Sequence, residues 1–92
     1  MTLRRADISG GPDYVPPRSE TERKLVEIWR EAMDLDMVGV EDDFFLLNGG
    51  SAVAAIIFAK INDVFGVKFP ISLLVKAPTV AQLAQRIDES KG

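Results

Sequence analysis

The first helical pattern in the chain lies in residues 19–33. Apolar side chains recur there at positions i, i+3, i+4 and i+7, namely Leu25, Ile28, Trp29 and Ala32. This spacing places them on one stripe of a helix. Ser19 stands before the stripe with Glu22 three residues further on, which is typical of a capping box. The pattern therefore predicts a helix from Ser19 to about Met33.

A second pattern starts at Ser51, where the apolar run Ala52–Ala59 opens a longer helical stretch. Gly66 is expected to end this helix, because glycine tolerates the positive φ of a C-cap. At about 100° per residue one face of the helix turns to the core. We expect that face to hold Ala54, Ile57, Phe58, Ile61 and Phe65. The residues Ala52, Ala55, Ile56 and Ala59 then point outward, with Val53 at the edge of the core stripe.

The last pattern follows Thr79, which is predicted to cap a final helix. Its apolar positions again fall at i, i+3, i+4 and i+7, as Val80, Leu83, Ala84 and Ile87. Residues 71–76 are predicted to form a short helix before it. With the two longer helices, these elements predict an all-α fold, a four-helix bundle with a long first loop and a short third helix.

Residues 34–50 lose the helical period but keep the apolar residues Leu35, Val38, Val40, Phe44, Phe45 and Leu47. A long loop with such anchors inside a compact domain is expected to be ordered and functional. We expect it to wrap the bundle and to present Ser51. Glycine and proline in the first stretch predict a flexible leader over residues 1–13, a domain over residues 14–88 and a tail over residues 89–92. Tyr14 and Val15 are expected to pack on the first helix.

Composition narrows the chemistry. The chain has 92 residues, a net charge of −3, and neither cysteine nor histidine. Ser-His-Asp and Cys-His catalysis, zinc knuckles and most transition-metal sites are therefore excluded. The mild negative charge argues against nucleic acid as a partner, and no apolar run approaches the ~20 residues that span a bilayer. We expect a cytoplasmic monomer that binds neither nucleic acid nor membrane.

Two acidic segments are weak candidates for a metal site. Asp34-Leu35-Asp36 begins like a calcium loop, but the twelfth position is Phe45 instead of the required glutamate. The cluster Glu41-Asp42-Asp43 favours a solvated loop, or one that steers a basic partner. We therefore predict no metal site.

The segment Asn48-Gly49-Gly50-Ser51 is the main candidate site. By itself it is compatible with a glycine-rich turn whose serine lies near a helix N-cap. Its wider context, Asp42-Asp43-Phe44-Phe45-Leu46-Leu47 before it and Phe65-Gly66-Val67 and Ala77-Pro78-Thr79-Val80 after it, resembles the carrier (thiolation) domains of nonribosomal peptide synthetases. The likeness extends from about Tyr14 to Asp88. It implies that the four-helix bundle is of the acyl-carrier-protein-like type.

The resemblance implies a function for Ser51. In that family the corresponding serine receives 4′-phosphopantetheine from coenzyme A through a phosphopantetheinyl transferase. The resulting thiol holds an aminoacyl or peptidyl group as a thioester, so the chain would be a non-catalytic peptidyl carrier protein in antibiotic or other natural-product biosynthesis. An adenylation enzyme and condensation or tailoring enzymes are the implied partners. Gly49 and Gly50 would leave room for the transferase at Ser51.

Partner contacts are expected at apolar residues that have no predicted role in the core. They are Ala52, Val53, Ile56 and Leu74, with Val75 as a further candidate. The family usually reads Gly-Gly-His/Asp/Asn-Ser-Leu/Ile around the serine, whereas this chain has Asn48, Gly50 and Ala52 at the differing positions. Which transferase accepts the chain is therefore left open by the sequence.

Two alternatives remain at this point. The first is an acyl carrier for polyketide or fatty-acid enzymes, which share the fold, the serine and the prosthetic group. Their second helix is typically strongly acidic, whereas here Asp63 is its only acid, so the peptidyl carrier is favoured. The second alternative is an unmodified helical interaction module in which Ser51 only caps its helix.

Overall fold

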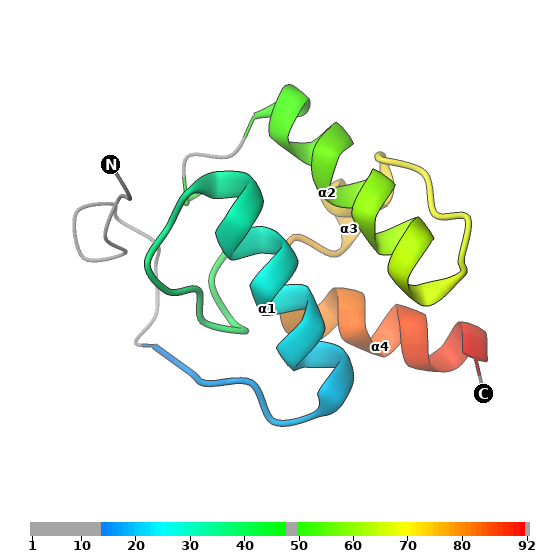
Figure 1. Cartoon of the computed structure of the whole chain (residues 1–92), viewed down its shortest axis with the longest axis horizontal. Helices are drawn as coiled ribbons and strands as arrows, with labels where there is room; N and C mark the ends of the chain where they lie inside the picture. Colours follow the sequence, from blue (N-terminus) through cyan, green and yellow to red (C-terminus); the bar gives the residue numbers. More distant parts are fainter. Residues whose placement is uncertain (1–13, 48–49, 92) are drawn as a thin grey trace.

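The computed structural model describes residues 14–47 and 50–91 (Figure 1). These residues form four helices and no strand: α1 (Glu20–Met33), α2 (Ser51–Phe65), α3 (Leu73–Lys76) and α4 (Val80–Lys91). The predicted all-α bundle with a long first loop and a short third helix is confirmed. The predicted leader, and Asn48 and Gly49 of the candidate segment, lie outside the described residues.

The start of α1 follows half of the predicted capping box. The Ser19 hydroxyl accepts a hydrogen bond from the Glu22 backbone N–H at 3.2 Å. The Glu22 carboxylate does not return this bond to Ser19. It accepts instead from the Arg18 backbone N–H at 2.8 Å and from the Arg18 guanidinium at 3.0 Å. The guanidinium is the stronger partner because it adds opposite charge to the hydrogen bond.

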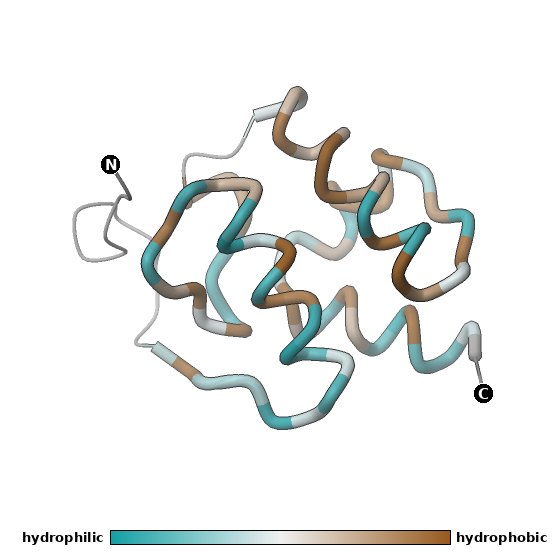
Figure 2. The backbone as a smooth tube through the Cα atoms, viewed as in Figure 1, coloured by the Kyte–Doolittle hydropathy of each residue, from teal (hydrophilic) through white to brown (hydrophobic). Residues whose placement is uncertain are grey.

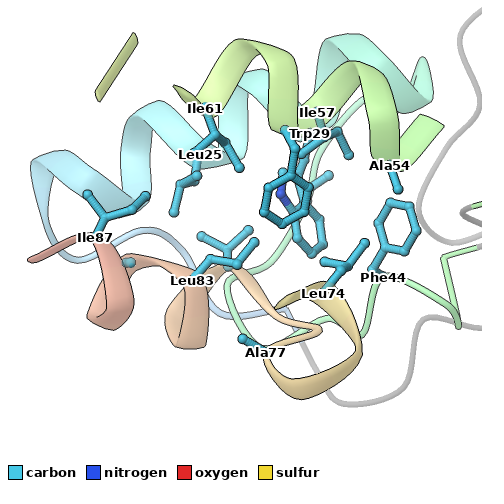
Figure 3. Packing of buried hydrophobic residues seen from close by; sticks show 14 of the residues in the cluster. Leu25, Trp29, Phe44, Ala54, Ile57, Ile61, Leu74, Ala77, Leu83 and Ile87 are labelled. Atoms are coloured by element: carbon cyan, nitrogen blue, oxygen red, sulfur yellow. The ribbon is translucent and has the colours of Figure 1, made fainter. Parts of the chain in front are cut away.

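The core lies where α1 packs against both α2 and α4. Figure 3 shows Leu25 and Trp29 of α1 meeting Ile57 and Ile61 of α2, with Leu83 and Ile87 of α4 on the opposite side. Every predicted core position of α2 and α4 is buried, namely Ala54, Ile57, Phe58, Ile61, Phe65, Val80, Leu83, Ala84 and Ile87. Helical periodicity therefore located the inward faces of both helices correctly.

The loop between α1 and α2 is anchored in this core. Of the six apolar residues named above as anchors, five are buried, Leu35, Val38, Val40, Phe44 and Leu47, whereas Phe45 is 52% exposed. Backbone hydrogen bonds fix the loop to the start of α4, from Phe44 N–H to the Pro78 carbonyl at 2.8 Å and from Ala81 N–H to the Val40 carbonyl at 2.9 Å. The predicted order of this loop is confirmed for residues 34–47, and only Phe45 does not act as a buried anchor.

The acidic cluster Glu41-Asp42-Asp43 was expected to be solvated, but this is wrong for one of its three residues. Asp42 is fully buried, and its Oδ2 accepts a hydrogen bond from the Gly39 backbone N–H at 2.9 Å. A buried carboxylate needs such donors to offset its lost hydration. Asp42 therefore organises the loop, and only its neighbours remain at the surface.

The short helix α3 begins at Leu73, two residues later than the predicted Ile71. The residues before it form a turn, in which Leu73 N–H donates to the Pro70 carbonyl at 3.0 Å. Asn62 of α2 holds the incoming segment by donating to the Phe69 carbonyl at 3.3 Å and accepting from the Phe69 N–H at 2.9 Å. None of the helices formed by residues 14–47 and 50–91 has the length and apolar character required to cross a membrane.

Candidate functional site

Ser51 is the first residue of α2, and its side chain is exposed. The residue in the N-cap position is Gly50, which has no side chain to bond the helix end. The Ser51 hydroxyl makes no hydrogen bond to another described residue. Because Gly50 and not Ser51 stands at the N-cap, the idea that Ser51 caps its own helix is wrong.

The N-terminus of α2 is open to an anion. The first N–H with an acceptor inside the helix belongs to Ala54, which donates to the Gly50 carbonyl at 2.9 Å. The N–H groups before it have no acceptor within the helix. The first turn carries no acidic residue either. The partial positive charge of this helix end is therefore not neutralised by a carboxylate of its own first turn.

Gly50 is not required by the backbone of the fold. Its φ of −126° is ordinary extended geometry, and a Cβ added there would meet no heavy atom within 4 Å. The missing side chain instead leaves the approach to the Ser51 hydroxyl open. The role predicted for Gly50, to leave room for a transferase, stays a prediction, and Gly49 lies outside the described residues.

A cavity of about 200 Å³ adjoins Ser51. Its apolar lining comes from three elements and consists of Phe44, Phe45, Ala54, Ile71, Leu74 and Val75. The loop thus supplies two rings, α2 supplies its first inward residue, and the segment around α3 closes the other side. The site offers an exposed nucleophile, a positive helix end and a neighbouring apolar surface. This set fits a phosphodiester that continues into a partly apolar chain.

The residues predicted to contact partners divide between surface and core. Ala52 is exposed and Ile56 is 52% exposed, whereas Val53 is half-buried and packs on the core. Leu74 is only 2% exposed, so its predicted partner contact is wrong. Its neighbour Val75 is 73% exposed and replaces it as a candidate.

Two exposed residues at the site, Phe45 and Ile71, were missed by the sequence reasoning. They are 52% and 46% exposed and line the same cavity as Val75. The Asp43 carboxylate accepts from the Phe45 N–H at 2.8 Å and starts a turn there. Asp43 is a residue type that favours turns, and successive side chains of a turn point in different directions. This was the signal in the sequence that Phe44 and Phe45 would not both face the core. We define Phe45, Ile71 and Val75 as the site patch.

A metal centre finds no support in the described part of the chain. Over residues 14–47 and 50–91 no group of three His, Cys, Asp or Glu side chains is placed to hold an ion. The three acids of the 41–43 cluster do not form one, because Asp42 turns inward to the Gly39 backbone.

Comparisons with known proteins bear on this site. The model of the family described as "Phosphopantetheine attachment site" matches residues 23–87. Gramicidin S synthase 2 of Brevibacillus brevis is 37% identical over 83 residues, which cover 90% of this chain but only 2% of that protein. The chain therefore corresponds to a small part of the curated relatives that it matches.

Solved structures agree with the family match. An active-site mutant of a peptidyl carrier protein superposes with a TM-score of 0.84 at 29% identity, covering 90% of this chain and 92% of the other. A chain in the structure of the phosphopantetheine transferase Sfp in complex with coenzyme A and a peptidyl carrier protein gives a TM-score of 0.80 at 32% identity. That match covers 83% of this chain and 99% of the other.

Proposed function

Because the chain belongs to the phosphopantetheine attachment family and is a carrier domain of the nonribosomal peptide synthetase type, we propose that Ser51 is its attachment residue. The observation that carries the proposal is the exposed Ser51 side chain at the N-terminus of α2, whose hydroxyl forms no hydrogen bond with the other described residues. The domain is a carrier and not an enzyme. The attached 4′-phosphopantetheine supplies a thiol that holds an aminoacyl or peptidyl group as a thioester.

Each part of the site has a task in this proposal. The Ser51 oxygen forms the new bond to phosphorus, the pyrophosphate bond of coenzyme A breaks, and 3′,5′-ADP leaves while the transferase takes the hydroxyl proton. The open N–H groups of α2 and the helix dipole stabilise the negative charge of the phosphodiester. Gly50 keeps the hydroxyl accessible, and the cavity lined by Phe44 and Leu74 borders the attachment point.

The partners are a phosphopantetheinyl transferase, an adenylation enzyme, and condensation or tailoring enzymes of natural-product biosynthesis. The site patch of Phe45, Ile71 and Val75 is the surface that we assign to them, because exposed apolar side chains beside a reactive group favour contact with a protein. Ala52 and Ile56 lie on the exposed side of α2 and remain candidates. A cytoplasmic location belongs to the same proposal, since coenzyme A and ATP are intracellular metabolites.

The peptidyl role is favoured over an acyl carrier for fatty-acid or polyketide enzymes by the surface of α2. Its first turn carries no acid, and Asp63 is the only acidic residue of the helix. A partner that recognises a strongly acidic second helix would find little complementary charge here. The nature of the attached group is therefore tested by which enzyme loads the modified protein, an adenylating enzyme or an acyl transferase.

The attachment residue is tested by incubating the purified protein with coenzyme A, Mg²⁺ and a broad-specificity phosphopantetheinyl transferase, and by recording intact masses. The wild type is expected to gain the mass of one phosphopantetheine group, and Ser51→Ala is expected to gain none. Ser72→Ala is the matched control, because Ser72 is exposed and lines the same cavity. A mass gain in Ser51→Ala, or no gain in the wild type with several transferases, would contradict the assignment.

A further inference from the structure

The segment between α2 and α3 carries part of the surface beside Ser51. In Figure 1 this segment turns back along α2 before α3 begins, and Figure 2 shows both hydrophobic and hydrophilic residues along it. Ile71 lies near its end, and Val75 follows in α3. Both residues are exposed members of the site patch and line the cavity at Ser51. The way in which the segment is held therefore determines where most of the patch lies.

The segment has few hydrogen bonds to the rest of the protein. Its own backbone bonds stay within residues 70–77, as from the Leu73 N–H to the Pro70 carbonyl at 3.0 Å. Among the residues that the structure describes, the only hydrogen bonds from residues 67–76 to another element are those between Asn62 of α2 and Phe69. The remaining attachment is apolar packing, as through the buried Leu74. Such packing is not directional, so the direction of the segment depends on Asn62.

Asn62 holds both backbone groups of Phe69. Its amide nitrogen donates to the Phe69 carbonyl at 3.3 Å, and its amide oxygen accepts from the Phe69 N–H at 2.9 Å. Two bonds to one residue fix the orientation of the chain as well as its position. Both residues are half-buried, and hydrogen bonds that are partly shielded from water are electrostatically stronger than exposed ones.

The connection from Phe69 to the site patch is short and stiff. Pro70 comes next, and its ring fixes its own φ and also restricts the backbone of Phe69 before it. The turn that follows is closed by the bond from Leu73 to Pro70, and it leads directly into α3. A shift of the Phe69 backbone is therefore passed on to Ile71 and Val75, because no flexible stretch lies between them to absorb it.

We propose that Asn62 is a positioning residue for partner recognition. By fixing Phe69 it holds Ile71 and Val75 at the cavity beside Ser51, where they contact the phosphopantetheinyl transferase. The inference rests on the proposed function, since it takes Ser51 as the attachment residue and the site patch as the contact surface. Asn62 does not line the cavity itself, so it acts only through the segment that it holds.

Steady-state kinetics of the transferase, with the protein as the varied substrate, measure this role. Asn62→Ala is expected to raise the KM for the protein several-fold and to leave kcat nearly unchanged. The reason is that the binding surface shifts while Ser51 and its helix end stay as they are. Asn62→Asp still accepts from the Phe69 N–H and should raise KM less. A lower kcat at unchanged KM, or an equal KM in all three proteins, would overturn the proposal.

Ser19→Ala separates the position of the segment from stability in general. This variant removes the hydrogen bond that caps α1 and is also expected to lower the midpoint of thermal unfolding. Ser19 does not line the cavity at Ser51, so the KM of this variant should equal that of the wild type. A rise in KM like that of Asn62→Ala would show that lost stability alone weakens recognition, and the proposal would be wrong.

A double variant tests whether Asn62 acts through the site patch. Val75→Ser removes one of the side chains that Asn62 is proposed to place. In the protein with both Asn62→Ala and Val75→Ser, KM should therefore rise by less than the product of the two single fold-changes. A rise equal to that product would mean that the two residues act independently, against the proposal.

The placement itself is measured without a transferase, on the isotope-labelled, unmodified protein. In Asn62→Ala the amide chemical shifts of Ile71 and Val75 are expected to change and their order parameters to fall. Leu25 in the core of α1 should keep its wild-type values. Unchanged values at Ile71 and Val75 overturn the positioning role, whether or not the wild type is modified. A wild type that gains no phosphopantetheine overturns the attachment assignment instead, so the two failures are distinguishable.

Discussion

The ring of Trp29 meets the ring of Phe44 edge to face, with centroids 5.5 Å apart and planes at 79°. Trp29 belongs to α1 and Phe44 to the loop that leads to Ser51, and both side chains are fully buried. The next ring, Phe45, stands edge to face on Phe44 at 5.3 Å and reaches the surface. The core of the bundle is thus connected through two aromatic contacts to the wall of the cavity at Ser51.

This connection predicts that Phe44 is important for stability. Phe44→Ala is expected to lower the free energy of unfolding by about 3–5 kcal/mol, because a buried ring is replaced by a void. Phe44→Leu should cost clearly less, since leucine fills part of the space. Urea unfolding followed by Trp29 fluorescence measures both, and a cost below about 1 kcal/mol for Phe44→Ala would contradict the packing.

The two glycines at the ends of α2 are expected to respond oppositely to substitution. Gly50→Asp should raise the free energy of unfolding by a few tenths to about 1 kcal/mol, because aspartate at the N-cap accepts from free N–H groups and favours the helix dipole. The added Cβ has open space. Gly66→Ala should lower it by about 1 kcal/mol, because Gly66 has a φ of +66°. Thermal unfolding of the two variants measures both changes in stability. Stabilisation by Gly66→Ala would contradict the assigned C-cap.

The ion pair at the start of α1 predicts a pH dependence. The hydrogen bond from the Arg18 side chain lowers the pKa of Glu22, and the Arg18 backbone N–H and charge act in the same direction against the cost of burial. A carboxyl whose folded pKa lies below its unfolded value, about 4.3, stabilises the folded state above that value. This contribution is lost as the pH falls through the folded pKa.

Glu22→Gln is the variant that reports this contribution. Its deficit in unfolding free energy relative to the wild type should be constant between pH 6 and 7 and should shrink below about pH 4.3. Urea unfolding at several pH values measures the difference. Asp63→Asn, at an exposed residue of α2 outside the pair, is the control for general charge effects. A deficit that stays constant down to pH 3 would contradict the lowered pKa of Glu22.

Asn62 is expected to position the segment that leads into α3. Its side chain makes two hydrogen bonds with the backbone of Phe69. Asn62→Ala leaves the Phe69 N–H and carbonyl without these partners, and we expect a cost of about 1–3 kcal/mol. Asn62→Asp keeps the acceptor and loses the donor. It should therefore lower the free energy of unfolding by less than Asn62→Ala does. Amide hydrogen exchange at Phe69 is the direct measurement, and unchanged protection in Asn62→Ala would contradict the role.

Helical periodicity predicted most of the fold, because the three long apolar stripes repeat over about two turns in α1 and α4 and about three turns in α2. It was less reliable where an element has a single turn. In α3 the consecutive residues Leu74 and Val75 are both apolar, and four residues of helix, Leu73–Lys76, contain no repeat that distinguishes the inward from the outward one. Phe44 and Phe45 pose the same problem in the loop. In both pairs tertiary contacts decide which side chain is buried.

Individual side chains were likewise predictable only where a local pattern in the sequence determines them. Ser51 could be found in the sequence because its residues resemble a family motif, and the end of the helix there follows from Gly50. The reciprocal capping contact that the sequence predicted for Glu22 does not form, because Arg18, before the helix, takes the same carboxylate. The burial of Asp42 depends on the loop fold, which brings the Gly39 N–H to its carboxylate.

Leu74 and Val75 provide a test of the site patch in which stability and partner contact separate. Leu74 is 2% exposed, so Leu74→Ala should cost about 2–5 kcal/mol by leaving a cavity. Val75 is 73% exposed, so Val75→Ser should change the free energy of unfolding by no more than about 0.5 kcal/mol.

Because Val75 stands on the wall beside Ser51, its loss should reduce contact with an enzyme that closes on that residue. We expect Val75→Ser to raise the KM of the phosphopantetheinyl transferase for the protein several-fold. Lys76→Ser, at the next exposed position of α3, is the control for surface changes that leave the apolar patch intact. If both variants raise KM equally, the contact depends on charge or on the helix as a whole, and the assignment of Val75 to the site patch is wrong.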